Sequence, residues 1–390
     1  MSNQATTERP ARIRLGMVGG GQGAFIGAVH RIAARLDDGF ELTAGAFSSD
    51  PDRAAASGAE LGVDPARSYA HFATMAKREA RRKDGVEAVA IVTPNHMHVP
   101  IALEFLKRGI HVICDKPLAA SLSDAKRLAR ASRGKNALFI LTHNYTGYPM
   151  IRQARAMVSA GDLGEIRVVQ VEYAQDWLAE PLENTDNKQA AWRTDPEKTG
   201  AGGATGDIGT HAYNLASYVT GLKCEALAAD LQAFVPGRRV DDNGHVLMRF
   251  EGGARGMLWC SQVAAGQEND LRLRVYGTRA GLEWRQEDPN YLWVGGLGQP
   301  LHRLSRNGAA TGPQAARVSR IPAGHPEGYL EAFANIYAEA ARAIIAHRDG
   351  QEPDAEVHFP GLQEGLEGMA FVDACVRSSK RNASWIKPAF

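Results

Sequence analysis

The chain has 390 residues, of which 44% are hydrophobic and 23% charged, and its 45 basic and 44 acidic side chains leave a formal net charge of +1. This length favours two domains over a single core. The balanced charge argues against a nucleic-acid-binding protein. No apolar stretch is long enough to span a bilayer, so we expect no membrane partner.

The cysteines and the N-terminal residues bear on the cellular compartment. Cys114, Cys224, Cys260 and Cys375 are widely spaced and form no metal-ligand pattern, so we expect neither a zinc site nor a disulfide framework. Free thiols suit a reducing compartment. The N-terminal sequence MSNQATTERPARIR lacks the apolar core of a signal peptide. We therefore expect a cytoplasmic protein.

Strand-like and helical segments alternate over the first third of the chain. Strands are expected at 12–19, 40–49, 86–94, 110–117 and 137–144, and helices at 25–36, 50–61, 69–82, 97–108 and 123–133. The 86–94 segment is almost continuously apolar, which is typical of a strand buried on both faces. The alternation predicts an α/β domain over residues 1–145, a Rossmann-type doubly wound parallel sheet.

The pattern changes after about residue 145. A helix at 149–160 is followed by long strands with alternating apolar residues at 165–177, 225–235, 245–264 and 271–286, and Gly252-Gly253 predicts a hairpin turn. Residues 296–325 are rich in loop-forming residues, and helices are expected at 327–347 and 361–377. We expect an α+β domain over 146–390 with an open-faced mixed sheet.

A glycine-rich turn links the first strand to the first helix in VGGGQGAFIGAVH, residues 18–30. Gly19 and Gly21 supply the first two glycines of a G-x-G-x-x-G pattern, with Gln22 next to them. The third glycine position is taken by Ala24, or by Gly27 if the loop carries an insertion. A strand before and a helix after the turn favour dinucleotide binding over a turn without a ligand.

The end of the second strand bears on the choice between NAD and NADP. An acid at this position usually binds the ribose 2′-hydroxyl of NAD. Here the strand ends in Ser48-Ser49, and Asp50 resembles the cap of the helix that starts at Pro51. Ser48, Ser49 and Arg53 suit a 2′-phosphate, or they are ordinary turn and surface residues. The cofactor is therefore NAD or NADP, with the preference undecided.

Polar side chains follow three further strands of the predicted sheet, where ligands of open α/β sheets bind. These segments are Thr93-Pro94-Asn95 with His98, Asp115-Lys116-Pro117, and Thr142-His143-Asn144-Tyr145. An ammonium group here could polarise a substrate oxygen or exchange a proton. The alternative is a surface lysine that caps strand carbonyls.

A second glycine-rich segment, GAGGATGDIGTHAYNLASYVTG at 200–221, leads into a helix. Asp207 and His211 are four residues apart and share one helix face. A carboxylate next to an imidazole suits deprotonation of a hydroxyl group, with the acid orienting or holding the base. The alternative is that Asp207 caps the helix and His211 is a core or surface histidine, and spacing alone favours it.

The segments GGGQGAFIGAVH, TPNHMH, DKPLA and GDIGTH, in this order, resemble the glucose–fructose oxidoreductase, inositol dehydrogenase and rhizopine catabolism family, Gfo/Idh/MocA. The resemblance covers nearly the whole chain. It implies hydride transfer between NAD(P) and a hydroxyl-bearing carbon of a sugar, inositol or related cyclic polyol. It also implies a homodimer or homotetramer formed through the C-terminal sheet.

The resemblance assigns roles to individual residues. Lys116 matches the family's E/D-K-P lysine, with Asp115 in place of the commoner glutamate, and Asp207 and His211 match its carboxylate and histidine. Further family matches border the cofactor: Thr93, Pro94, Asn95, His98, Trp192 and Arg193. In the implied mechanism His211 accepts the hydroxyl proton and Lys116 stabilises the alkoxide.

Substrate discrimination requires further polar groups, because matched hydroxyls give most of the selectivity for a polyol. Asn144 and His325 are the candidates beyond the catalytic residues. No metal is required for hydride transfer. Two alternatives remain open: an inactive NAD(P)-binding relative with a regulatory or scaffold role, and a physiological ketosugar reductase.

Overall fold

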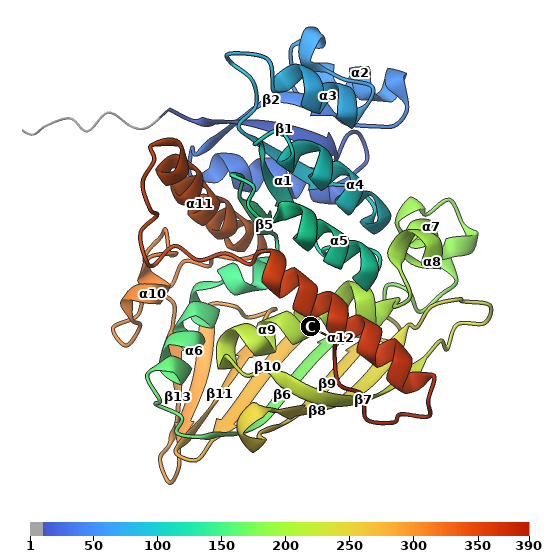
Figure 1. The fold of residues 1–390 in the computed structure, drawn as a ribbon. Helices are drawn as coiled ribbons and strands as arrows, with labels where there is room; N and C mark the ends of the chain where they lie inside the picture. Colours follow the sequence, from blue (N-terminus) through green and yellow to red (C-terminus); the bar gives the residue numbers. More distant parts are fainter. Residues whose placement is uncertain (1–10, 390) are drawn as a thin grey trace, which may run out of the picture.

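The computed structural model describes residues 11–389 and contains two sheets with helices packed around and between them (Figure 1). A five-stranded sheet lies in the N-terminal part and an eight-stranded sheet in the C-terminal part. The two predicted domain ranges begin at residue 1 and end at residue 390, and both of these residues lie outside the described part. The division at residue 145 stays a prediction.

The N-terminal sheet is parallel, with strand order β2-β1-β3-β4-β5. Its strands are β1 (Ile13–Gly19), β2 (Phe40–Ala46), β3 (Ala88–Val92), β4 (His111–Cys114) and β5 (Phe139–Leu141). Its helices are α1 (Phe25–Leu36), α2 (Pro51–Glu60), α3 (Phe72–Glu79), α4 (Asn95–Leu106) and α5 (Leu122–Ser132). Every residue of β3 and β4 is buried, as the apolar runs predict. The predicted doubly wound fold is confirmed.

Helix α2 shows how closely local chemistry sets an element boundary. Asp50 precedes the helix with extended backbone, and its Oδ1 accepts a hydrogen bond from the Arg53 amide at 2.8 Å. Pro51 occupies the first helical position, where its missing N–H costs nothing. The predicted role of Asp50 as a helix cap is confirmed.

The C-terminal sheet is mixed, with strand order β13-β12-β11-β10-β6-β9-β8-β7. Its strands are β6 (Ile166–Ala174), β7 (Cys224–Gln232), β8 (Asn243–Phe250), β9 (Arg255–Ser261), β10 (Asp270–Gly277), β11 (Ala280–Arg285), β12 (Tyr291–Gly296) and β13 (Leu301–Ser305). Only the β6–β9 pair is parallel among these. The Gly252-Gly253 turn joins β8 and β9 as predicted.

Two predictions of local structure in this half were wrong. The segment 271–286 forms two antiparallel strands, because the chain reverses between Tyr276 and Gly281, which pair with each other. The loop-rich segment 296–325 contains β13 and the short helix α10 (Pro313–Ala316). Strand β13 is mostly exposed and so lacks the alternating apolar pattern by which a half-buried strand is detected.

Helices cover one face of the C-terminal sheet. They include α6 (Pro149–Ser159) and α9 (Thr210–Thr220), and α9 continues a π-helical turn, η4 (Thr205–Gly209). The short helices α7 (Lys188–Arg193) and α8 (Pro196–Thr199) lie at the edge of the molecule beside α4 (Figure 1). Figure 1 shows no described helix on the opposite face of the sheet, which is open.

The two C-terminal helices return to the N-terminal half. Helix α11 (Tyr329–Arg348) packs against α1, and its side chains join the apolar core formed by β1 and β3. Helix α12 (Leu362–Ser379) lies between α5 and β7 and so bridges the two halves (Figure 1). The N-terminal sheet is therefore completed by a helix that follows it by almost 200 positions.

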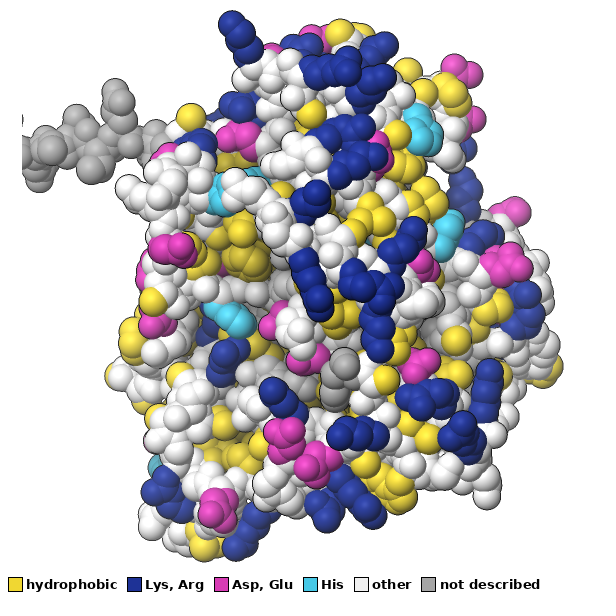
Figure 2. All heavy atoms as spheres, in the orientation of Figure 1, with side chains coloured by type: hydrophobic (Ala, Val, Ile, Leu, Met, Phe, Trp, Pro, Cys, Tyr) yellow, Lys and Arg dark blue, Asp and Glu magenta, His cyan; other side chains and the backbone are white. Residues whose placement is uncertain are grey.

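The surface in Figure 2 carries charges of both signs, with Lys and Arg side chains frequent over α5. This helix contributes Lys126, Arg127 and Arg130. None of the helices within residues 11–389 combines the length and the apolar character needed to cross a bilayer.

Candidate active site

A cleft of about 570 Å³ runs along the carboxyl edge of the parallel sheet. It is bounded by the glycine turn, by the ends of β2, β3 and β4, and by α7 and η4 of the second half. Most of the predicted cofactor-binding residues line it: Gly19, Gly21, Gln22, Ser48, Ser49, Arg53, Thr93, Pro94, Asn95, Asp115, Lys116, Trp192 and Arg193. Gly27 and His98 are not among the residues that line the cleft.

The glycine turn has the geometry of a phosphate-binding loop. Gly19 and Gly20 have φ angles of +79° and +71°, which favour glycine. A Cβ atom on Gly27 would lie 2.4 Å from the Cα of Gly20, so this glycine allows α1 to pack directly on the turn. Close helix–strand approach is the task of the third glycine in dinucleotide-binding turns. Gly27 occupies that place, and Ala24 does not.

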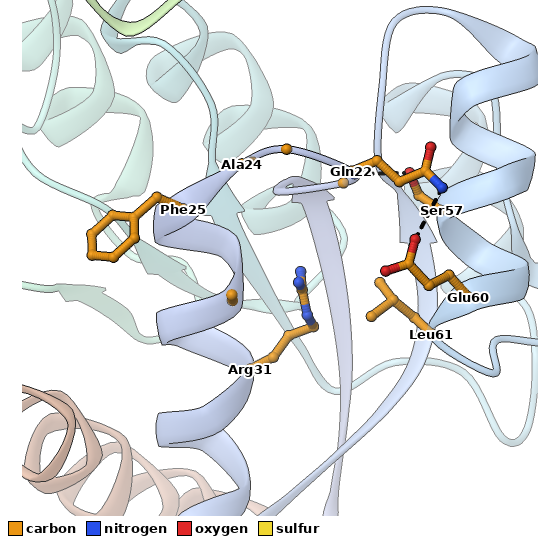
Figure 3. Close-up of a pocket in the computed structure, with 10 residues that line it drawn as sticks. Gln22, Ala24, Phe25, Arg31, Ser57, Glu60 and Leu61 are labelled. Carbon is orange, nitrogen blue, oxygen red and sulfur yellow. Dashed lines mark hydrogen bonds between the residues drawn. The ribbon is translucent and has the colours of Figure 1, made fainter.

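Side chains from α1 and α2 hold this turn in position. The Gln22 amide donates to Ser57 Oγ at 3.1 Å, and Gln22 Nε2 donates to Glu60 Oε2 at 2.9 Å (Figure 3). From α1, Arg31 Nη1 donates to the Gly20 carbonyl at 2.6 Å. The turn is thus fixed from both neighbouring helices, and the backbone that would meet a pyrophosphate is preorganised.

The far end of the cleft, beyond β2, has mixed chemistry. Ser48, Ser49 and Arg53 line it, and Phe47, His71 and Phe72 close it. The His71 and Phe72 rings stack with centroids 4.4 Å apart. Sequence patterns did not single out these last two residues, because they belong to the start of α3 and not to a strand end. Planar rings beside hydroxyl and guanidinium groups suit an adenosine.

Lys116 and Asp207 form the centre of the other end of the cleft. Lys116 follows β4, and its Nζ donates to Asp207 Oδ1 at 2.6 Å and to the Asp207 carbonyl at 2.9 Å. The side chains of both residues are only 15% exposed. The Lys116–Pro117 peptide bond is cis. The structure thus brings together the lysine and the carboxylate that the sequence predicts as catalytic.

The second oxygen of Asp207 is also engaged. Gln262 Nε2 donates to Asp207 Oδ2 at 2.9 Å, and Arg193 Nε lies 3.4 Å from the same oxygen. Burial alone would raise the pKa of Asp207, but the charges of Lys116 and Arg193 and the hydrogen bonds from Lys116 and Gln262 hold it well below its usual range. Asp207 is therefore anionic and binds the Lys116 ammonium group. Gln262 was not predicted, because it follows β9 and lies 55 positions from Asp207.

His211 lies in the first turn of α9 but does not pair with Asp207. No hydrogen bond between them exists among the described residues, because Lys116, Gln262 and Arg193 occupy the carboxylate. The expectation that the acid orients the imidazole directly is therefore wrong. Instead, the His211 ring contacts Tyr145 edge-on at 4.8 Å and His143 at 5.4 Å.

The environment of His211 keeps the imidazole neutral. Burial, together with the charge of Lys116 and the neighbouring His143, lowers its pKa well below the ordinary value. Burial and Lys116 also lower the pKa of His143 to about 3. His211 Nδ1 is buried and has no hydrogen-bond partner within residues 11–389. The ring is therefore neutral, and one of its nitrogens carries a lone pair.

The remaining predicted site residues, His98, Asn144 and His325, differ in their burial and in their hydrogen-bond partners. His98 is buried, and its ring nitrogens lie 2.7 and 2.8 Å from the carbonyls of Pro117 and Thr93, so it braces the ends of β3 and β4. Asn144 is buried, and its Nδ2 has no partner in the described part of the chain. His325 is exposed and does not line the cleft.

The residues present fit a nicotinamide dinucleotide. The glycine turn leaves no room for a Cβ at Gly21, where one would lie 2.6 Å from Ser57 Oγ, so backbone lines the cleft there. Thr93 lines the cleft, and its Oγ1 is buried and has no hydrogen-bond partner within residues 11–389. The glycine turn suits the pyrophosphate, and the end of the cleft beyond β2 suits the adenosine. The nicotinamide would therefore lie at the remaining end, which Lys116 and Asp207 close.

A Rossmann sheet with such a cleft is typical of dinucleotide-dependent oxidoreductases, and comparison with known proteins places the chain more narrowly. Residues 13–145 match the family described as "Oxidoreductase family, NAD-binding Rossmann fold", and residues 151–283 match the "GFO/IDH/MocA C-terminal domain". The chain belongs to the Gfo/Idh/MocA family. It is an NAD(P)-dependent oxidoreductase, as the sequence motifs predict.

Several relatives are similar over almost the whole chain. An oxidoreductase from Sinorhizobium meliloti of known structure is 62% identical, with a TM-score of 0.89 and coverage of 97% of this chain and 100% of that one. An inositol dehydrogenase homolog from Azotobacter vinelandii, solved with NADH and myo-inositol, is 40% identical, with a TM-score of 0.91 and coverage of 97% and 98%. Levoglucosan dehydrogenase from Pseudarthrobacter phenanthrenivorans is 27% identical over 96% of this chain and 97% of the relative.

Proposed function

We propose that the chain oxidises a secondary alcohol of a sugar, an inositol or a related cyclic polyol, or reduces the corresponding ketone. The observation that carries this proposal is the Lys116–Asp207 ion pair at the nicotinamide end of the cleft, together with the buried, neutral His211, whose pKa the Lys116 charge lowers. Relatives named for levoglucosan and solved with myo-inositol support a ring that bears several hydroxyl groups.

Lys116 would stabilise the substrate oxygen. Its ammonium group has three N–H donors, of which Asp207 Oδ1 and the Asp207 carbonyl accept two. The third N–H is free to donate to a substrate hydroxyl. This hydrogen bond would become stronger as the substrate oxygen becomes an alkoxide. Asp207 keeps the ammonium group in place by binding it from the opposite side.

His211 would accept the proton of the same hydroxyl. The imidazole is neutral, so one of its nitrogens has the lone pair that would take this proton. Bound NAD(P)+ would supply the hydride acceptor, and the alcohol becomes a ketone as its proton and hydride leave. In the reductive direction His211 would return the proton.

Further polar atoms near His211 suit additional hydroxyl groups of the substrate. Asn144 Nδ2 and His143 Nδ1 are both buried and unpartnered within the described residues. A buried donor or acceptor without a partner costs free energy, which a matched hydroxyl would recover. The unpaired atoms are therefore expected to select against substrates that lack a hydroxyl at the corresponding position.

The test is nicotinamide reduction with NAD or NADP and a panel of inositols, aldoses, anhydrosugars and glycosides. Turnover of a few related polyols is expected. No turnover in either direction, with nucleotide binding intact, would favour an inactive regulatory relative. Turnover of ketosugars with NAD(P)H, and none of the polyols with NAD(P)+, would favour a physiological reductase.

We infer that the open face of the C-terminal sheet forms a homo-oligomer interface. Apolar side chains are exposed along it on neighbouring strands: Val168, Leu247, Met257, Tyr276, Trp293 and Leu301. Leu247 pairs with Met257 in the strand register, so these two form a continuous patch. Leu247→Glu should lower the mass measured by light scattering from dimer or tetramer to monomer. Leu297→Glu, at a more exposed leucine in the turn after β12, should not.

We also propose a cytoplasmic location. All four cysteines are free and buried, which suits a reducing compartment. Cell fractionation of the native protein tests this, and recovery in an extracytoplasmic fraction would contradict it.

A further inference from the structure

Asp115, the residue before the catalytic lysine, contacts a buried histidine that the proposed mechanism does not use. His30 lies on α1 with no exposed surface, and its Nε2 is 3.7 Å from Asp115 Oδ1. Nε2 has no hydrogen-bond partner among the described residues. A buried N–H of this kind is costly unless an anion lies close to it.

A residue from the C-terminal helix fixes the orientation of this ring. The Tyr337 hydroxyl, on α11, lies 2.8 Å from His30 Nδ1. If the hydroxyl donates to Nδ1, then the ring proton is on Nε2, where it faces the carboxylate. The opposite arrangement would direct an imidazole lone pair at an anion. The observed partners therefore favour an ordered chain, Tyr337 to His30 to Asp115.

Asp115 itself faces the cleft. Its Oδ1 also accepts a hydrogen bond from Thr142 Oγ1 at 3.0 Å, whereas Oδ2 has no partner in the described part of the chain. Asp115 lines the cleft next to Lys116, at the end assigned to the nicotinamide. Burial would raise the pKa of this carboxyl, but His30 and Lys116 lower it to about 2.

The charges at this end of the cleft show what the carboxylate contributes. Lys116 and Arg193 are both within 4 Å of Asp207, which thus serves two cations. Asp115 supplies the second negative charge. Without it, this end of the cleft would carry a net positive charge, which would oppose the positively charged ring of oxidised NAD(P)+ and leave the neutral ring of NAD(P)H unaffected.

We propose that His30 and Tyr337 position the Asp115 carboxylate beside the nicotinamide, where its charge offsets that of the two cations and raises the affinity for the oxidised cofactor relative to the reduced one. Asp115 then acts by its charge, and His30 and Tyr337 act through Asp115 as positioning residues. This inference rests on the proposed function in one respect, that the nicotinamide of the bound dinucleotide lies at the Lys116 end of the cleft.

The test measures the dissociation constants of NAD(P)+ and NAD(P)H by calorimetry, in the absence of substrate. Asp115→Asn should raise the constant for the oxidised form about tenfold relative to that for the reduced form, the size expected for one charge interaction in a cleft. For a two-electron couple this equals a change of about 30 mV in the potential of the bound cofactor. Asp115→Glu, which keeps the charge, should retain most of the preference.

A matched pair of tyrosine variants tests the positioning residues. Tyr337→Phe removes the hydroxyl that orients His30 and should lower the preference for the oxidised form about threefold. Tyr148→Phe also removes a buried hydroxyl, but one without a partner among the described residues, and should have no effect.

The outcomes distinguish this inference from the proposed function. If Asp115→Asn weakens both nucleotides equally, or if Asp115→Glu behaves like Asp115→Asn, the charge has no differential role and the inference is wrong. If Tyr337→Phe leaves the ratio of the NAD(P)+ and NAD(P)H dissociation constants unchanged, Tyr337 and His30 do not position Asp115. If neither nucleotide binds the unmodified protein, the proposed function fails instead.

Discussion

Lys116 Nζ and Asp207 Oδ1 lie 2.6 Å apart, although 91 positions separate the two residues and they belong to different halves of the molecule. Lys116 follows a strand of the parallel sheet, and Asp207 belongs to the π-helical turn that covers the second sheet. The predicted catalytic pair therefore forms only where the two halves meet. A substrate at this point touches both, and the ion pair fixes their relative position at the nicotinamide end of the cleft.

Replacement of Lys116 by alanine should lower turnover by orders of magnitude with little change in the affinity for NAD(P)H, whose nicotinamide ring is neutral. The ammonium group is the donor expected to stabilise the developing alkoxide, which exists only along the reaction path. Steady-state kinetics on a polyol substrate and calorimetry with the nucleotide measure the two effects. Lys198→Ala is the matched control, because Lys198 pairs with Asp195 at 3.1 Å on the surface. Retained turnover in Lys116→Ala would show that the lysine has no catalytic role.

Replacement of Gln262 by leucine should lower kcat about tenfold. Gln262 is 3% exposed and donates to the Asp207 carboxylate, and a buried hydrogen bond to a charged group contributes about 1.5–3 kcal/mol. Loss of this donor should loosen the carboxylate that holds Lys116. The exposed Gln314 provides the control variant Gln314→Leu, which should match the unmodified enzyme. An unchanged kcat in Gln262→Leu would limit Gln262 to a packing role.

Sequence reasoning succeeded where the chemistry is local and failed where it depends on packing. The helix at 25–36 has the predicted bounds, and α2 starts at Asp50-Pro51, because capping and apolar spacing act within one segment. The exposed strand β13 escaped prediction, since neither face carries an apolar pattern. Contacts between distant segments were also beyond reach: nothing in the residues around Gln262 indicates that its amide binds Asp207.

The candidate site divides in the same way. Ligands of open α/β sheets bind at the carboxyl ends of the strands, which predicted that Thr93, Asp115 and Lys116 share one edge of the sheet. All three line the cleft. The direct pairing of Asp207 with His211 was wrong, because spacing on a helix cannot reveal that other segments already occupy the carboxylate. The catalytic and binding roles of these residues stay predictions.

Replacement of Arg53 by alanine should weaken NADP+ about tenfold and change the affinity for NAD+ less than twofold. Arg53 is exposed at the adenosine end of the cleft, where a 2′-phosphate would gain a charge-assisted interaction that a ribose hydroxyl would not. Binding of both nucleotides by calorimetry measures the ratio. Arg78→Ala, at an exposed position on α3 outside the cleft, is the control. If the affinities for NADP+ and NAD+ fall equally, Arg53 contacts a part of the cofactor other than the 2′-position.

Buried histidines should make the protein less stable as the pH falls from about 6.5 toward 4. Burial, and next the charge of His347, lowers the pKa of His111 to about 4, and burial with Arg155 and Arg152 lowers that of His358 to the same value. In the unfolded chain a histidine binds its proton near pH 6.5. Between these values the unfolded state holds more protons, so stability rises with pH, by up to about 1.4 kcal/mol per unit for each such histidine.

Urea unfolding at pH 7, 6 and 5, without nucleotide, measures this slope. His111→Gln removes one of the titrating groups, and its side-chain oxygen can replace Nδ1 as acceptor for the Leu138 amide, which donates to it at 2.9 Å. The variant should therefore lose less stability than the unmodified protein between pH 7 and 5. His302→Gln, at an exposed histidine of β13, should leave the slope unchanged. Equal slopes in all three proteins would show that His111 does not contribute to acid destabilisation.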